Sequence, residues 1–314
     1  MAQSYPSHQF EVIVADDFST DATAAKVAGY AGGNIRIIAL RDFIKEGSIN
    51  SYKKKAIEIS IKESRGDLIV TTDADCIAAP GWLETIAAFY SEYHPAFICA
   101  PVAFNPNNSF LSIFQSLDFM TLQAITGASV YTKTHNMCNG ANLAYEKNVF
   151  NEVGGFAGVD HIASGDDMLL MEKISTVHPT RVFYLKSKEV IISTAAMNSF
   201  KDFLNQRIRW ASKTSNYTDK KMVAVLALVY IFNVWILVLA LLSIFYFPIC
   251  LLGLLLLGKI IIELFFLYPV ASFFNNKKLL WWFPVAQPFH ILYTIIAGWL
   301  GTFGSYTWKG RSVK

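Results

Sequence analysis

Two pairs of acidic residues follow hydrophobic runs in the first quarter of the chain. Asp16-Asp17 ends the run FEVIVA, and Asp73-Ala74-Asp75 ends the run DLIVTT. Two carboxylates spaced by one residue can hold a hard divalent cation such as Mg²⁺ or Mn²⁺, with substrate phosphates completing its coordination shell. A lone Asp-X-Asp is more commonly a solvated turn. Its position directly after a β-branched run favours the metal-binding interpretation here.

A third acidic pair, Asp166-Asp167, opens an expected helix over residues 168–176. Carboxylates at a helix N-terminus often serve only as caps. Capping needs one of the two, however, and the glycine-rich approach GGFAGVDHIASG is typical of an active-site loop. A carboxylate in such a loop could act as a general base that removes the proton of an acceptor hydroxyl.

The run Gln206-Arg207-Ile208-Arg209-Trp210 is the fourth chemically informative segment. Arginine offers fixed donors suited to a diphosphate, and tryptophan offers a flat face for a sugar ring. The run is weak evidence by itself, because both residue types are also common at membrane interfaces.

The elements that must position these residues alternate between strands and helices. Such alternation predicts an α/β domain with a mostly parallel sheet flanked by helices, over residues 1–198. Ligands bind such sheets outside the carboxyl ends of the strands, where the acidic pairs lie. The expected strands are 10–15, 35–40, 67–72 and 96–103, and the expected helices are 21–30, 50–64 and 80–93.

The last third of the chain is strongly apolar. Residues 222–247 and 279–303 carry no charge, and 249–274 carries only Lys259 and Glu263. Each segment exceeds the roughly 20 residues that cross a bilayer, so we expect about three transmembrane segments within 222–304. Buried core helices are the alternative. Lys259 and Glu263 are four residues apart and could pair on a helix or line a glycan path.

Two further stretches read as helices beside the membrane. Residues 110–125 are apolar and aromatic but interrupted by polar side chains, which suggests a helix against a membrane surface or against other helices. We expect residues 199–221, which carry QRIRW, to form an interfacial helix, with an ordinary amphipathic surface helix as the alternative. Residues 305–314 form a basic tail.

Composition excludes several other classes of protein. The net charge of +3 is too small to indicate a nucleic-acid partner. The four cysteines lie far apart, without the spacing of a zinc site or a disulfide framework, and fit a reducing compartment. The N-terminal residues contain no apolar run, so no signal peptide is expected.

Lysines predict the orientation in the membrane. Those before the first apolar segment place the catalytic domain in the cytoplasm, in a multi-pass protein of the inner (plasma) membrane with membrane lipids around it. Three crossings would leave the basic tail outside, against the same rule. Either one apolar segment is re-entrant or interfacial, with the proline-containing last one favoured, or the rule fails there. Lys213, Lys220 and Lys221 precede the first apolar segment, Lys277 and Lys278 follow the second, and Pro284 and Pro288 lie in the last.

Taken together, these segments resemble family 2 of inverting, membrane-associated glycosyltransferases, which have the GT-A fold. The resemblance covers nearly the whole chain and includes cellulose- and hyaluronan-synthase-type and ceramide glucosyltransferase-type enzymes. It rests on four motifs in order ahead of the apolar segments, with two further matching segments. The motifs are VADDFSTDAT, TTDADC, SGDD and QRIRW, and the further segments are NGANLAYEK and YKKKAI.

The resemblance implies roles for individual residues. Asp167 would be the catalytic base, and Asp73 and Asp75 would engage the diphosphate and a Mg²⁺ or Mn²⁺ ion. Lys54 would be a basic residue near the nucleotide, although three adjacent lysines compete for that position. The other expected contacts are Asp16 and Asp17 with the base and ribose of the nucleotide, Arg209 with the diphosphate, and Asn139, Gly140, Asp166, Gln206 and Trp210 with the substrate or acceptor.

The implied function is inverting transfer of a sugar, UDP-linked by this resemblance, to a glycan or lipid acceptor at the membrane. One departure is that relatives begin with a further strand before the one at residues 10–15, so we expect a truncated chain. The alternative is a catalytically incomplete, transferase-like membrane protein that acts as an assembly subunit. A transporter would need more polar groups within the apolar segments than Lys259 and Glu263.

Overall fold

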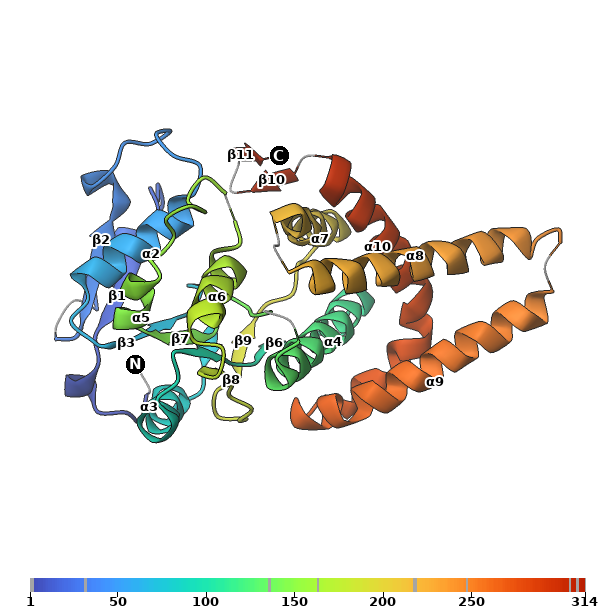
Figure 1. The fold of residues 1–314 in the computed structure, drawn as a ribbon, viewed down its shortest axis with the longest axis horizontal. Helices are drawn as coiled ribbons and strands as arrows, with labels where there is room; N and C mark the ends of the chain where they lie inside the picture. Colours follow the sequence, from blue (N-terminus) through green and yellow to red (C-terminus); the bar gives the residue numbers. More distant parts are fainter. Residues whose placement is uncertain are drawn as a thin grey trace. The chain divides into compact units, whose positions relative to one another are not determined.

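The structure is a computed structural model, which describes residues 3–30, 33–134, 137–162, 164–216, 219–246, 248–304, 306–308 and 311–313. The chain forms two compact units, whose helices and strands are labelled in Figure 1. The first contains Met1–Val102 and Val130–Ile192, and the second contains Ala103–Ser129 and Ser193–Lys314. The segment 103–129 therefore groups with the C-terminal helices. The sequence-based boundaries at residues 198 and 221 remain predictions.

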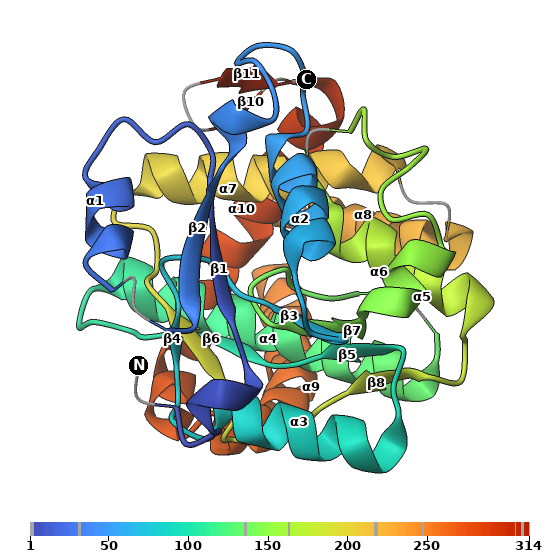
Figure 2. The same cartoon turned by 90° about the vertical axis from the view of Figure 1, so that its left-hand side faces the viewer.

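The first unit begins with a parallel pair of strands, seen side by side in Figure 2. Strand β1 (Val12–Asp16) pairs with β2 (Ile35–Ala39) in a register that sets Asp16 opposite Ala39. Their β-branched side chains suit a pleated, half-buried surface. Helix α1 (Thr23–Ala28) connects them. A crossover helix between parallel strands is the arrangement expected for this region from the sequence.

A second sheet has four strands in the order β3-β7-β5-β8. Strand β7 runs antiparallel to both β3 and β5, whereas β5 and β8 are parallel, so this sheet is mixed. The expected strand at 96–103 divides at Ala100-Pro101, because proline has no backbone N–H to donate. The four strands of this sheet are β3 (Leu68–Thr71), β5 (Phe97–Cys99), β7 (Leu143–Glu146) and β8 (Val182–Tyr184), and β6 (Val102–Phe104) follows the break as part of another sheet.

Helices pack their apolar side chains against this sheet. Buried residues of α6, among them Leu170 and Ile174, join Phe97, Leu143 and Tyr145 of the strands in one core. A third sheet has the order β4-β9-β6. The remaining elements here are α2 (Tyr52–Glu63), α3 (Trp82–Tyr93), α5 (Lys147–Glu152), α6 (Asp166–Val177), β4 (Ile77–Ala78), β9 (Ile192–Thr194), η1 (Ser7–Gln9) and η2 (Leu40–Asp42).

The second unit is mainly helical. Its core joins apolar residues of α4, α7, α9 and α10, including Phe114, Phe203, Leu267 and Ala286. Helix α4 thus packs against other helices, one of the two settings expected for it. The elements are α4 (Phe110–Thr132), α7 (Phe200–Ser212), η3 (Lys213–Asn216), α8 (Lys220–Leu242), α9 (Ile249–Phe273), η4 (Lys277–Trp282), α10 (Phe283–Phe303), β10 (Tyr306–Trp308) and β11 (Arg311–Val313).

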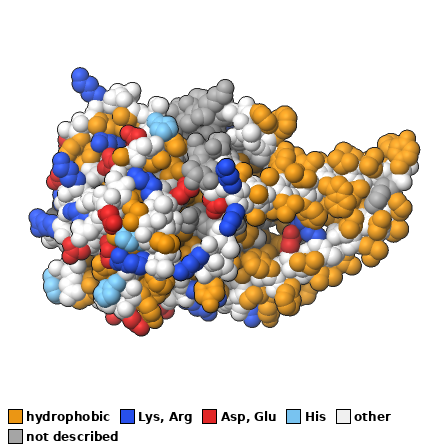
Figure 3. All heavy atoms as spheres, viewed as in Figure 1, with side chains coloured by type: hydrophobic (Ala, Val, Ile, Leu, Met, Phe, Trp, Pro, Cys, Tyr) orange, Lys and Arg blue, Asp and Glu red, His pale blue; other side chains and the backbone are white. Residues whose placement is uncertain are grey.

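Three segments of the second unit are long and apolar enough to cross a membrane, namely Lys220–Leu242, Ile249–Phe273 and Lys277–Phe303. Figure 3 shows hydrophobic side chains covering the visible faces of α8 and α9. Soluble proteins do not normally expose apolar surface on this scale, so these helices indicate membrane association. The fold class expected from the sequence, an α/β domain followed by three long apolar helices, is confirmed.

Candidate active site

The antiparallel pairing of β3 with β7 brings two of the predicted motifs together in the first unit. Thr71, at the end of β3, lies opposite Leu143, at the start of β7. The residues that follow β3 and those that precede β7 therefore share one edge of the sheet. These are Asp73 and Gly140 with their neighbours. The hydroxyl of Thr71 donates to the Gly140 carbonyl oxygen at 3.4 Å.

Lys53 joins the carboxylates at this edge. Its ammonium nitrogen lies 3.0 Å from Asp73 Oδ1 and 3.4 Å from Asp166 Oδ2. Burial opposes the charge on Lys53, but Asp166, Asp73 and Asp167 outweigh it and raise the pKa of Lys53 well above its ordinary value. The lysine side chain therefore stays cationic and holds carboxylates from two distant parts of the chain in one cluster.

Asp167 is held by the backbone of the NGAN segment. The Gly140 N–H donates to Asp167 Oδ2 at 3.1 Å, and the Met168 N–H donates to Oδ1 at 2.9 Å. Gly165, in the left-handed conformation with φ of 81°, turns the chain into α6 just before this pair. The fixed carboxylate lies next to Asp166 and half-buried. This geometry suits a general base, which must be oriented before the acceptor arrives.

Gly140 has no side chain where the cluster is tightest. A Cβ atom on it would lie 3.4 Å from both Asp166 Oδ2 and Lys53 Nζ. Asn142, two residues on, anchors the segment, because its buried amide accepts from Trp82 Nε1 at 3.0 Å and donates to the Pro101 and Val190 carbonyls. Asn139 accepts from the Ala141 N–H at 3.0 Å and so shapes the turn.

Lys54 takes a different position from Lys53. Its side chain is almost fully buried, and its ammonium donates to the backbone carbonyls of Val159, Ile162 and Ser164. These carbonyls belong to the loop that leads into α6. Sequence reasoning assigned Lys54 to the nucleotide and did not single out Lys53. Only the direction of each side chain from α2 separates the two neighbours.

A pocket of about 450 Å³ opens beyond the carboxyl ends of β1 and β2. Asp16 is buried beside it and lies 3.5 Å from Arg41 Nη2, while Asp17 is half-buried. Phe18 turns the chain here with a positive φ of 54°, which is uncommon for a bulky residue and concentrates at functional sites. The pocket is lined by Phe18, Arg41, Asp42, Phe43, Ile44, Lys45 and Glu46.

Asp73 and Asp75 could hold a divalent cation, although among the described residues no group of three His, Cys, Asp or Glu side chains is arranged to do so. Asp75 is exposed, and the Asp73 side chain is 42% exposed. Mg²⁺ is normally bound through one or two carboxylates with substrate phosphates and water completing its shell. The pair therefore fits an ion that arrives with a diphosphate.

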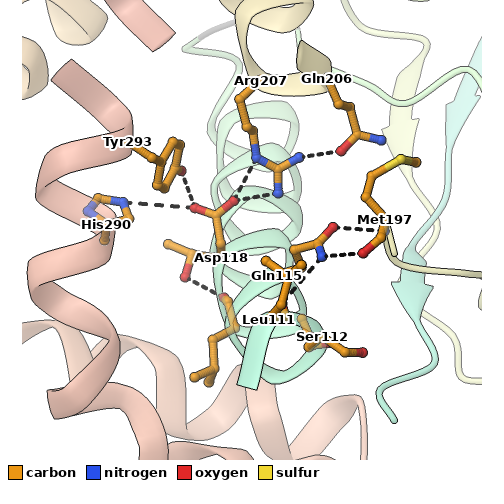
Figure 4. A network of polar contacts seen from close by, with 12 residues as sticks. Leu111, Ser112, Gln115, Asp118, Met197, Gln206, Arg207, His290 and Tyr293 are labelled. Carbon is orange, nitrogen blue, oxygen red and sulfur yellow. Dashed lines mark hydrogen bonds and ion pairs between the residues drawn. The ribbon is translucent and has the colours of Figure 1, made fainter. Parts of the chain in front are cut away.

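The QRIRW motif lies on α7, in the second unit, and its two arginines differ. Arg207 is 4% exposed and contacts Asp118 of α4, with Nε at 3.1 Å and Nη2 at 2.6 Å from Oδ2 (Figure 4). Its guanidinium also lies 4.2 Å from the Trp210 ring centroid and donates to Gln206. Arg209 is only half-buried. Arg207 thus orients Gln206 and Trp210, a role that the sequence did not reveal.

These features define the class of the protein as a GT-A-type α/β domain that presents a carboxylate cluster, joined to long apolar helices. The model of glycosyl transferase family 21 matches residues 1–314. The chain therefore belongs to glycosyl transferase family 21, a GT-A family of the same clan as the one it resembles in sequence, which confirms that resemblance.

Individual proteins show weaker similarity. The glycosyltransferase AglE of Haloferax volcanii is 26% identical over 169 residues, which are 53% of this chain and 51% of AglE, so the alignment spans about half of that relative. Residues 1–349 of TarS from S. aureus, solved with UDP-GlcNAc, are 17% identical with a TM-score of 0.46, over 99% of this chain and 89% of that one. Glucosyl-3-phosphoglycerate synthase from Mycobacterium tuberculosis is 14% identical with a TM-score of 0.40, over 62% and 63%.

Proposed function

We propose that the protein transfers a sugar from a nucleotide-diphosphate sugar to a hydroxyl group of a glycan or lipid acceptor at the membrane. The observation that carries the proposal is the cluster in which Lys53 contacts Asp73 and Asp166 while Gly140 holds Asp167. It combines a cation for phosphate charge, exposed carboxylates for a metal ion and a fixed candidate base.

The nucleotide is assigned to the pocket next to β1 and β2. Asp16 accepts from the Ser19 N–H and contacts Arg41, so the pocket has an ordered polar wall beside the aromatic ring of Phe18. An aromatic face suits a nucleobase, and Asp17 is suited to accept from ribose hydroxyls. The sequence resemblance favours a UDP-linked donor, and the pocket itself does not distinguish between bases.

The diphosphate is assigned to Lys53, Asp73 and Asp75. A Mg²⁺ or Mn²⁺ ion held by the two aspartates would neutralise the charge that develops on the leaving nucleoside diphosphate. Lys53 adds a positive charge at the same edge of the sheet and keeps Asp73 and Asp166 in place before the donor binds. The sequence resemblance, and no contact in the structure, supports the assignment of Arg209 of the QRIRW motif to the diphosphate and of Gln206 and Trp210 to the acceptor.

Asp167 is assigned the role of general base. It would remove the proton of the acceptor hydroxyl as the oxygen attacks the anomeric carbon in a single displacement, which inverts the configuration at that carbon. The Gly140 N–H restricts the rotation of the carboxylate and leaves it half-buried near the acidic cluster. An α-linked donor would then give a β-linked product.

The proposal is tested with full-length protein in native membranes and a panel of labelled nucleotide sugars. We expect metal-dependent release of nucleoside diphosphate and a labelled, β-linked product from one of the donors. A product one sugar long would identify a single-addition enzyme, whereas a ladder of lengths would identify a polymerase. Absence of both donor binding and transfer would contradict the proposal and favour the non-catalytic assembly subunit.

A further inference from the structure

Helices α8 and α9 form a hairpin: they meet at their connection and run back from it toward the rest of the second unit (Figure 1). They contain 23 and 25 residues, or about 35 Å each at ~1.5 Å per residue, enough for a bilayer core of about 30 Å. Of the residues between them, the structure describes Ser243–Tyr246 and Pro248. If both cross the bilayer, the start of α8 and the end of α9 are on the same side. The lysines at these ends, Lys220 and Lys277, agree.

Helix α10 begins beside the C-terminal half of α9. Phe283 and Ala286 of α10 pack in one cluster with Leu267 and Ala271 of α9. The next residue, Gln287, accepts from Lys259 Nζ at 2.6 Å. The first turns of α10 are therefore tied to the second half of α9, through Leu267 and Ala271, and to its middle, through Lys259.

The other end of α10 returns to the residues that precede α8. A Cβ atom on Gly301 would lie 2.6 Å from Ala211 Cβ, at the last turn of α7, so the two helices are in close contact there. The following strand, β10, also contacts α7. Gly298, between the two ends, lies against Tyr230 of α8. Both ends of α10 thus lie at the open end of the hairpin, and Figure 1 shows α10 running across α8 and α9.

Helix α10 has one exposed hydrophobic face and one face that packs against protein. Hydrophobic side chains spaced three or four residues apart remain exposed along its whole length, which makes one continuous stripe. The opposite face packs against protein and includes polar groups: Tyr293 donates to Asp118, and Gln287 joins Lys259. The stripe consists of Val285, Phe289, Leu292, Ile296, Trp299 and Phe303.

We propose that α10 does not cross the bilayer but lies in its surface on the catalytic side, with this stripe buried between lipid headgroups and acyl chains. Amphipathic helices of this kind bind membranes in that plane. The two tryptophans directly before α10, Trp281 and Trp282, are exposed and are of the type enriched at such interfaces. The chain then crosses the membrane only twice.

This arrangement removes the conflict in the distribution of basic residues. With two crossings, the basic tail at 305–314 lies on the same side as Lys220 and Lys277, as the positive-inside rule requires. Of its basic residues, Lys309 and Lys314 lie outside the described residues. The arrangement also sets α7, with the QRIRW motif, against a helix that rests on the lipid surface, because α7 and α10 are packed together.

The first test determines on which side of the membrane the C-terminus of the full chain lies. One of two reporter proteins is fused after Lys314. Alkaline phosphatase is active only outside the cytoplasm, and the chosen fluorescent protein matures only in the cytoplasm. We expect fluorescence and no phosphatase activity. Phosphatase activity at this position would show a third crossing and overturn the proposal.

A second measurement uses the connection between α8 and α9 and needs only two substitutions. In a Cys250→Ser background, Tyr246→Cys places one thiol at an exposed position in the hairpin turn. A membrane-impermeant maleimide is expected to label it in intact cells, with Lys220→Cys in the same background as the internal control. Labelling of the Tyr246→Cys variant only after permeabilisation would show that the hairpin does not cross, and would also overturn the proposal.

Discussion

Arg207 and Asp118 form a buried ion pair that ties the QRIRW helix to α4. The Arg207 Nη2 atom lies 2.6 Å from Asp118 Oδ2, and each side chain is 4% exposed. Tyr293 donates to the other carboxylate oxygen (Figure 4). The Arg207 guanidinium lies 4.2 Å from the Trp210 ring centroid. Because both charges are desolvated, each depends on the other. The pair therefore controls the orientation of Trp210 without belonging to the proposed reacting groups.

Removing one partner of this pair should destabilise the second unit. Asp118→Asn leaves the Arg207 charge buried without its counter-ion, a loss that typically costs about 3–5 kcal/mol. We expect a lower melting temperature in detergent and a fall in transfer activity together. Asp202→Asn, at an exposed carboxylate in the first turn of α7, is the matched control and should lose far less stability. Equal melting temperatures for the two variants would contradict this assignment.

Arg209 should respond differently from its neighbour in the motif. Arg209→Lys keeps the positive charge but loses the forked geometry that suits a diphosphate. We expect the KM for the donor to rise several-fold with little change in melting temperature, whereas Arg207→Lys should lower the melting temperature. Donor titrations alongside thermal unfolding of both variants distinguish the roles. A reversed pattern would exchange the assignments of the two arginines.

Lys53→Met removes the cation shared by Asp73 and Asp166. We expect weaker donor binding and at least a tenfold loss in kcat/KM, because the carboxylates then repel each other and the diphosphate loses a positive charge. Lys62→Met, on an exposed turn of the same helix, is the control. Isothermal titration with the donor and metal ion measures the difference. An unchanged affinity in the Lys53 variant would remove Lys53 from the site.

Gly140→Ala tests whether the space at the cluster is needed. The added methyl group would lie 3.4 Å from Asp166 Oδ2 and Lys53 Nζ and 3.5 Å from Asp167 Cβ. These are ordinary contacts, so we expect a stable fold with a fall in kcat/KM as the methyl group displaces substrate or tilts Asp167. Gly66→Ala, at a position without such neighbours, is the control. Full activity in Gly140→Ala would show that substrate does not approach this position.

The apolar helices contain a second polar cluster, and its members should be coupled. Lys259 Nζ lies 2.6 Å from Glu263 Oε1, and Gln287 Nε2 donates to Glu263 Oε2 at 2.7 Å. Glu263→Leu leaves Lys259 without its counter-ion in an apolar environment and should destabilise the protein. Adding Lys259→Met should recover part of that loss. Additive losses of stability in the double variant would show that the two residues do not form a pair.

Sequence periodicity and segment length predicted where the helices and strands lie along the chain. They were less successful in predicting which of these elements are neighbours in space. The three apolar segments and the run before Asp16 are where they were expected, because hydrophobic runs of these lengths have few alternatives. The antiparallel strand β7 was not expected, since NGANLAYE has no strict alternation and its partners β3 and β5 lie far away in the chain.

For the candidate site, too, the sequence predicted the individual residues better than the contacts between them. Its acidic residues were identified from motifs, but the difference between Lys53 and Lys54 depends on which face of α2 meets the sheet. Arg207 and Asp118 are 89 residues apart, and no local pattern connects them. Such contacts follow from packing, which local propensity does not determine.

The most direct test of the central claim compares Asp167→Asn with Asp160→Asn, an exposed carboxylate in the same unit. Both proteins are assayed for donor binding and for nucleoside diphosphate release in the presence of acceptor. Loss of a general base typically reduces turnover about 10²–10⁴-fold. We predict a loss of that size for Asp167→Asn with donor affinity retained, and wild-type turnover for Asp160→Asn. Full turnover in Asp167→Asn would contradict the proposed mechanism.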